Sequence, residues 1–293
     1  MTPAVNSLRK IFIGLRDFWI IYRRSKYGVV GLGIILFFFF IAVAAPLITR
    51  YNPYETNPNA YLLPPSSEHW FGTNEVGQDL FSLNIYGARI SLLVGFTAAL
   101  IAVSLGTLIG LVSGYYGGLI DEFLMRITDF FLVIPPIILM IVIGAVLGPS
   151  LINVIIIIGM LSWSPTARVV RSMVLSIKEW AFIEAIRAIG GGDRRIIFRH
   201  ILPNVASVIY ANMALATSNA IFSHAAMVFL GVGNVNDLSW GMILHYAFAS
   251  GALSTGKWWY FVPPGVFIVL VIIGFVLVGF SLEEIFNPRL RRK

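Results

Sequence analysis

Residues able to carry out covalent or metal chemistry are few in this sequence and lie far apart. The 293-residue chain has no cysteine, which excludes disulfides, thiolate metal sites, iron–sulfur clusters and a thiol nucleophile. No two of its four histidines share the spacing that places metal ligands on one helical face: His69, His200, His224 and His245. Because HExxH and GxSxG segments are also absent, we expect no catalytic residue, metal site or cofactor in this chain.

Segment 251–257 has the spacing of a phosphate-binding loop but lacks its chemistry. It reads Gly-Ala-Leu-Ser-Thr-Gly-Lys. Trp258 follows at the position where a Ser or Thr would bind magnesium, and no strand pattern precedes the segment. We therefore interpret the match as coincidence and expect no nucleotide site here.

The most informative spacing lies in the charged segment 172–203. Glu184-Ala185-Ile186 is followed after three residues by Gly190, and nine further residues lead to His200-Ile201-Leu202-Pro203. Apolar residues recur among charges over 176–189, which predicts a helix that the glycines at 190–192 end. A second basic segment follows, and we expect a new helix, the fifth span, to begin at Pro203. Such a helix pair could dock on a partner protein or lie on a membrane surface.

The composition places the chain in a membrane. Its residues are 58% hydrophobic and 12% charged, whereas a soluble domain carries about 25% charge. A bilayer core about 30 Å thick needs roughly 20 apolar residues in a helix. Stretches of that kind occur at 28–49, 88–114, 122–147, 151–171, 204–231 and 259–282. Because lipid satisfies no backbone groups, each predicts a helix, and the fold class is all-α with six transmembrane helices.

Charge placement predicts the orientation. With the N-terminus inside, 18 of the 21 Lys and Arg residues are cytoplasmic, and Arg50, Arg89 and Lys257 lie outside. Both termini are then cytoplasmic in a multi-pass protein of the cell membrane, and the net charge of +7 reflects loop bias and not nucleic-acid binding. Ala42-Val43-Ala44 leaves open a cleaved signal peptide, although the apolar stretch is longer than signal peptides have.

These elements divide the chain into segments. The expected divisions are a cytoplasmic N-terminal segment 1–27, a first transmembrane helix with its extracytoplasmic loop 28–87, a five-helix core 88–282 containing the loop 172–203, and a basic tail 283–293. The outside loop at about 50–87 is long enough for a small folded cap. The third outside loop carries Trp240, Trp258 and Trp259, which we expect at the membrane interface.

Few polar side chains lie within the spans. Asn212, Asn219 and Ser223 share one face of the fifth span, with His224 beside it. Ser162 and Thr166 lie on the fourth span, where Pro165 predicts a kink. Such groups face a protein interior or a water-filled path, so these are candidate path residues, with helix–helix hydrogen bonding as the alternative.

Two further clusters are expected to be structural. Gly106, Gly110, Gly114 and Gly118 recur every four residues and predict close helix packing, with a conduction path as the alternative. Asp121, Glu122, Arg126 and Asp129 begin the third span, where capping and a Glu122–Arg126 pair at i,i+4 are expected, with a proton relay as the alternative. The lack of carboxylates deep in the spans argues against a self-sufficient carrier driven by protons or sodium.

The 184–203 spacing resembles the cytoplasmic loop of the permease subunits of binding-protein-dependent ABC importers. That loop reads EAA, three residues, G, nine residues, I, one residue, LP; Ile186 and His200 depart from it. The phrase at 198–204 is typical of the C-type permease of the dipeptide and oligopeptide branch. Residues 69–79 resemble HxLGTDxxGRD with Gln78 at the Arg, residues 86–92 resemble YGARxSL, and residues 239–241 and 287–289 also fit. His224 stands where the family often has Glu.

The resemblance implies a type I importer permease. Its expected partners are a homologous permease, two cytoplasmic ATPases that bind ATP and magnesium, an extracytoplasmic solute-binding protein and the lipid membrane. Peptides are the expected cargo, with oligosaccharides or nickel as alternatives. The loop would couple ATPase movement to the spans through Glu184, Ala185, Arg187, Ile189, Gly190, Arg194, Arg195, Leu202 and Pro203. Ala185 and Ile189 would face the ATPase, and Glu184 would pair with one of the arginines.

Overall fold

The computed structural model describes residues 19–286, which form helices joined by loops. Most of the expected N-terminal segment 1–27, the motif 287–289 and most of the basic tail 283–293 lie outside those residues. Over the described range one isolated bridge, Thr73 to Asp79, is the only β pairing. The longer elements are α2 (Lys26–Ile48), α3 (Leu80–Tyr116), α4 (Gly118–Val133), α5 (Pro136–Leu147), α6 (Leu151–Leu161), α7 (Ser164–Ile177), α8 (Ala181–Ala188), α10 (Leu202–Phe229), α11 (Trp240–Ala249) and α12 (Trp258–Phe286).

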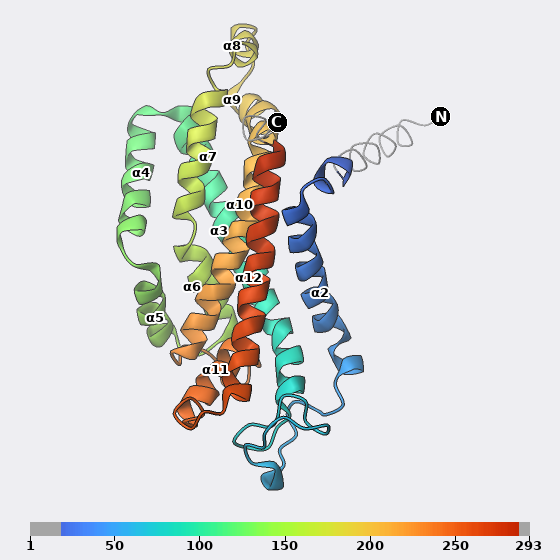
Figure 1. Ribbon diagram of the computed structural model, residues 1–293. Coiled ribbons are helices and arrows are strands. Elements are labelled where there is room, and N and C mark those ends of the chain that lie inside the picture. The colour runs from blue at the N-terminus through green and yellow to red at the C-terminus, as the bar shows by residue number, and fades with distance from the viewer. Residues whose placement is uncertain (1–18, 287–293) are drawn as a thin grey trace.

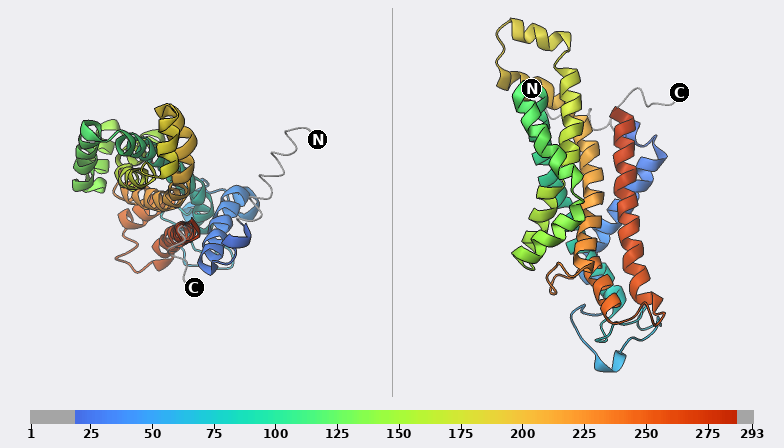
Figure 2. Two further views of the ribbon diagram at one scale, coloured as in Figure 1. Left: turned by 90° about the horizontal axis from the view of Figure 1, so that it is seen from above. Right: turned by 90° about the vertical axis from the view of Figure 1, so that its left-hand side faces the viewer.

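The long helices form one bundle with a loop structure at each end. Helices α4–α5 and α2 lie at opposite edges, and α3, α7, α10 and α12 lie between them (Figure 1; Figure 2). At one end stand α8 and the short α9 (Asp193–Ile196), and at the other lie α11 and the loop that joins α2 to α3. Helix α2 begins, and α12 ends, at the α8 end, so the chain enters and leaves the bundle on one side (Figure 1).

The spans confirm the all-α membrane fold, with one correction. Within the described residues five helical stretches are long and apolar enough to cross a membrane, or six if a bent pair counts as one. That pair is α4 and α5, which meet at 87°, so the continuous helix expected over 122–147 is wrong. Pro135 and Pro136 explain the bend, because a proline disfavours helix in the residue before it and provides no N–H.

Helix α3 is longer than expected. It begins at Leu80 and not at 88, and its 37 residues measure about 55 Å at 1.5 Å per residue. This length exceeds the hydrocarbon core of about 30 Å, so α3 extends beyond it. A kink is expected at Pro165; the structure instead separates α6 and α7 at Ser162–Trp163, with Pro165 in the first turn of α7.

The glycine stripe on α3 packs against α7, as predicted. A Cβ added at Gly106 would lie 2.5 Å from the Trp163 carbonyl oxygen, and one at Gly110 would lie 2.6 Å from that of Ala167. At Gly114 it would lie 2.8 Å from the Val174 Cβ. Small residues thus let two helix backbones touch. Gly118 does not belong to this contact, because nothing lies within 4 Å of its Cβ position.

A polar bond from α3 compensates a defect in α2. Pro46 lies inside α2 and has no N–H to donate to the Ala42 carbonyl. Arg89 of α3 donates to that carbonyl from Nε at 2.6 Å and from Nη2 to the Val43 carbonyl at 3.3 Å. Helix α2 also contacts α12, where a Cβ at Gly31 would lie 2.7 Å from the Gly274 carbonyl oxygen.

Replacing Gly110 with Ala should lower the stability of the subunit. The new Cβ meets the backbone of α7, and overpacking of this kind costs about 1–3 kcal/mol. The thermal unfolding midpoint of the purified protein in detergent is the measurement. Gly33→Ala is the matched control, because nothing lies within 4 Å of the Gly33 Cβ position. Equal midpoints for the two variants would contradict the packing role of the stripe.

Candidate functional sites

The loop at the α8 end has one anchored face and one exposed face. Ile183 is fully buried in a cluster with Ile177, Ile196 and Ile201, which joins α8 to the ends of α7 and α10. Ala185, Arg187 and Ile189 are exposed, and Ile189 is 85% exposed. An apolar side chain that is so exposed at a helix end is available to a partner protein.

Gly190 ends α8 in the way the sequence predicted. Its φ is +82°, a conformation that residues with a Cβ rarely adopt. The Gly190 N–H donates to the Arg187 carbonyl at 3.0 Å and the Gly191 N–H to the Ile186 carbonyl at 2.9 Å, the bonds of a Schellman motif. The helix itself is shorter than the expected 176–189, because α7 continues to Ile177 and a turn precedes Ala181.

The remaining loop residues lie near these two. Glu184 is exposed in the first turn of α8 and forms no ion pair with another described residue, so the structure does not support its pairing with an arginine. Arg194 and Arg195 are exposed on α9, where they line an open groove with Arg199 and Phe198. This end of the molecule is therefore basic.

No separate helix begins at Pro203. Asp193–Phe229 is one continuous helical stretch, with a π-helical segment over Ile197–Ile201. The Leu202 N–H donates to the Ile197 carbonyl, five residues back, and Pro203 lies in the first turn of α10, where a proline is tolerated. Leu202 is half-buried and Pro203 is exposed. The helix therefore continues through Pro203, with a π-helical segment directly before Leu202.

One polar bond joins this loop to the end of α3, and others join α3, α4 and α7 to one another. Tyr115 at the end of α3 donates to Asp193 Oδ1 at 2.6 Å. Asp121 of α4 accepts from Arg171 of α7 at 2.6 Å from Nε and at 2.5 Å from Nη2, and also accepts from the Ser113 hydroxyl.

Sequence reasoning missed these inter-helix pairs. It assigned Asp121 to helix capping and counted Arg171 only as a cytoplasmic charge, because the two residues are 50 positions apart. Arg168 likewise pairs with Asp129. The expected Glu122–Arg126 pair is confirmed, at 3.7 Å.

The candidate path residues separate into two groups. Asn212, Asn219 and Ser223 lie on a face of α10 that is at least partly exposed, and Asn219 is the most open of the three. His224 points elsewhere: it is 2% exposed, and its Nδ1 has no hydrogen-bond partner among the described residues.

The two candidates from the fourth span also differ from that α10 face. Thr166 is buried against Gly106 of α3, so it serves helix packing. Ser162 lies half-buried at the break between α6 and α7. Of the six candidates, the structure therefore brings together only the three on one face of α10.

At the opposite end, residues 50–79 form the folded cap that the sequence predicted. Asp79 caps α3 by accepting from the Ser82 N–H at 2.8 Å and the Ser82 hydroxyl at 2.7 Å. Its other oxygen lies 2.9 Å from Nδ1 of His69. Gly77 has φ +75°, and a Cβ there would lie 1.9 Å from the Asn57 carbonyl oxygen. Residues of the 69–79 motif thus hold the cap together and attach it to α3.

The expectation that Trp240 lies at the membrane interface is wrong. It is fully buried at the start of α11, and its indole N–H donates to the Asn84 carbonyl of α3 at 2.9 Å. It packs edge-to-face on Phe38 of α2. Trp258 is exposed. Segment 251–257 is a turn after α11 in which the Thr255 hydroxyl donates to the Gly251 carbonyl.

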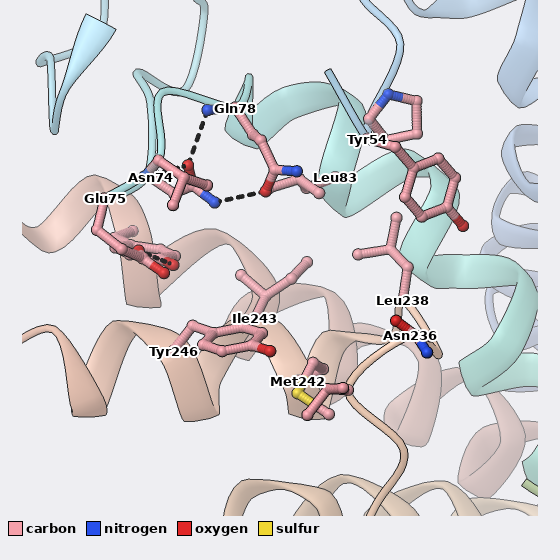
Figure 3. Close-up of a pocket in the computed structure, with 14 residues that line it drawn as sticks. Tyr54, Asn74, Glu75, Gln78, Leu83, Asn236, Leu238, Met242, Ile243 and Tyr246 are labelled. Atoms are coloured by element: carbon pink, nitrogen blue, oxygen red, sulfur yellow. Dashed lines mark hydrogen bonds between the residues drawn. The ribbon is translucent and has the colours of Figure 1, made fainter. Parts of the chain in front are cut away.

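A cavity of about 370 Å³ lies between the cap, α11 and the start of α12 (Figure 3). Glu75 is the only charged residue among the described residues that line it. The Tyr260 hydroxyl donates to Glu75 Oε2 at 2.6 Å. Asn74 accepts from the Gln78 N–H at 2.8 Å and donates to Gln78 Oε1 at 2.8 Å. Near the cavity, Asp237 Oδ2 is buried without a partner among the described residues, and burial raises the pKa of this carboxyl.

The sequence alone did not indicate this cavity. Three of its polar residues lie inside the 69–79 motif, but Tyr246 and Tyr260 come from segments about 170–185 positions later. No periodicity in the sequence connects those segments. The nearest signal was Gln78, which stands where the resembled motif has Arg.

Comparisons with known proteins cover most of the chain. Residues 106–292 match the family described as "Binding-protein-dependent transport system inner membrane component". Residues 15–65 match the "N-terminal TM domain of oligopeptide transport permease C".

Curated relatives agree with both matches. The chain is 42% identical over 270 residues to the dipeptide transport system permease protein DppC of Alkalihalophilus pseudofirmus, covering 92% of this chain and 88% of the relative. It is 36% identical over 278 residues to the oligopeptide transport system permease protein OppC of Bacillus subtilis, covering 94% and 90%. With DppC of Haemophilus influenzae the identity is 33% over 285 residues, covering 95% and 96%.

Asp121→Ala should destabilise the bundle by about 1–3 kcal/mol, because it leaves the partly buried Arg171 guanidinium without its acceptor. The double variant Asp121→Ala/Arg171→Met should recover part of that loss. Glu122→Ala is the control, since its pair with Arg126 is exposed and worth little. Thermal midpoints in detergent are the measurement. An Asp121→Ala midpoint equal to that of Glu122→Ala would show that the pair does not hold α4 on α7.

Proposed function

Because the chain belongs to the family of inner membrane components of binding-protein-dependent transport systems, we propose that it is a non-catalytic permease subunit of an ABC importer for peptides. The observation that supports this proposal is that residues 106–292 and 15–65 match permease families. Relatives named for dipeptide and oligopeptide transport agree with it. Those names do not favour oligosaccharides or nickel, and the family does not favour a self-sufficient carrier.

The exposed face of α10 supports a shared translocation path. Asn212, Asn219 and Ser223 are polar, lie together and are only partly covered by this chain. Polar groups at membrane depth require a protein or a water-filled surrounding. A homologous permease packed on this face would enclose a path between the two subunits, with lipid around the rest.

The α8 loop supports coupling to cytoplasmic ATPases. Ile183 attaches α8 to the bundle, whereas Ala185 and Ile189 are free to enter a groove on a partner. Arg187, Arg194 and Arg195 add exposed charges, each worth no more than about 1 kcal/mol at a rim. Movement of an ATPase would reach α3 through Tyr115 and Asp193. ATP and magnesium would bind to the ATPases, while an extracytoplasmic binding protein would deliver peptide at the cap end.

Gly190→Val should uncouple transport without preventing assembly in the membrane. A side chain at φ +82° costs about 1–2 kcal/mol, enough to disfavour this end of α8 roughly 5- to 30-fold. In the reconstituted complex we expect reduced ATPase retention or ATP hydrolysis without uptake. Gly192→Val is the matched control, since Gly192 has φ −71° and open space around its Cβ position. Wild-type retention, hydrolysis and uptake for Gly190→Val would exclude this coupling role.

The proposed orientation places α8 in the cytoplasm and the cap outside. Ser67, Ser254 and Ser176 are all exposed, and the chain has no cysteine, so single cysteines at these positions report cleanly. An impermeant thiol reagent added to intact cells should label the first two and not the third. Labelling at Ser176 from outside would reverse the orientation.

A further inference from the structure

The cavity beside the cap has no role in the coupling or the path described above. Its walls come from the cap, the start of α3, the segment before α11, α11 itself and the start of α12. It therefore lies at the end of the bundle, where the proposed orientation places the extracytoplasmic solution. Its volume of about 370 Å³ is within the range of small-molecule sites.

The charge of the cavity favours a cation. Glu75 is half-buried and is the only ionisable acid or base besides tyrosines in the lining. Its Oε2 accepts from Tyr260, whereas Oε1 has no hydrogen bond to a described residue. A partly desolvated carboxylate with a free oxygen is a strong acceptor for an ammonium group. The rings of Tyr54 and Tyr246 border the same space and can face a cation (Figure 3).

Gln78 presents hydrogen-bond donors at a fixed position. Its Oε1 is held by the Asn74 amide, which orients Nε2 away from Asn74 (Figure 3). Neither N–H of Nε2 bonds to a described residue, so both are available to a carbonyl or carboxylate oxygen. Acceptor and donors therefore stand on one wall of the cavity.

Much of the remaining lining is apolar. It includes Leu83, Leu238, Met242 and Ile243, and Met can adapt to side chains of different shape. An ammonium, a nearby carbonyl and an apolar side chain are the three features that this lining matches. They occur together at the amino terminus of a peptide.

We propose that this cavity binds the amino-terminal residue of a peptide, with its ammonium on Glu75 and its first carbonyl on Gln78. The inference rests on the proposed function as a peptide importer and adds a binding site on the permease itself. A lysine of the binding protein would satisfy Glu75 as well, but it would leave the Gln78 donors unused. The amino terminus accounts for both.

Direct binding tests the site. The assembled complex in lipid nanodiscs, without binding protein, is dialysed against radiolabelled alanyl-phenylalanine and against its N-acetyl form. Wild type should bind the free dipeptide at least tenfold more tightly than the acetylated one. Glu75→Gln should lose that tenfold preference, because a neutral amide still accepts from Tyr260 but no longer attracts an ammonium.

Two further variants sharpen the result. Gln78→Arg places a cation beside Glu75 and should also abolish the preference. Glu68→Gln, a neutralised cap residue outside the cavity lining, should retain it. Thermal midpoints and subunit retention confirm that each variant is assembled.

The outcomes separate the two proposals. Equal binding of both dipeptides by wild type, or an unchanged preference in Glu75→Gln, overturns the site. Failure of the wild-type complex to take up any peptide with ATP and binding protein present would instead overturn the proposed function, whatever the dialysis shows.

Discussion

The contact between the backbones of α3 and α7 determines where the other helices can lie. Apolar side chains gain little from leaving lipid, so helix association in a membrane depends on close packing and on polar bonds. Three glycines on α3 remove the side chains that would separate the helices, and the carbonyls of Trp163 and Ala167 fill the space. Helices α4 and α10 each pack on both members of this pair, so their positions follow from it.

Polar bonds attach the two ends of α3 to neighbouring segments, where the glycine contact does not reach. At the cap end, Asp79 caps the helix and is held by His69, while Arg89 satisfies the carbonyl that Pro46 leaves open in α2. At the other end, Tyr115 reaches Asp193. An unsatisfied backbone group in lipid costs several kcal/mol, which explains why the proline in α2 is accompanied by an arginine from a neighbouring helix.

The sequence predicted those features that depend on local composition. Hydropathy located the spans, the recurrence of Gly106, Gly110 and Gly114 predicted the α3 packing face, and the glycines at 190–192 predicted the end of α8. The bend between α4 and α5 also has a local cause, Pro135 and Pro136, but the apolar residues continue on both sides of them, so hydropathy does not reveal it.

Other features depend on contacts between distant segments, which no local pattern reveals. The pairing of Asp121 with Arg171 and the burial of Trp240 against Asn84 are of this kind. The cavity is the clearest example, because its acid and one of its tyrosines are 185 positions apart.

The π segment at Ile197–Ile201 sets the rotational register between the α8 loop and α10. An α-helix turns by about 100° for each residue, since 3.6 residues complete a turn. A π turn holds one more residue than an α turn, so the segment before it is displaced around the helix axis by about that angle relative to an unbroken α-helix. The direction in which the exposed Ala185 and Ile189 point is therefore decided by the hydrogen-bonding pattern of the five π-helical residues that precede α10.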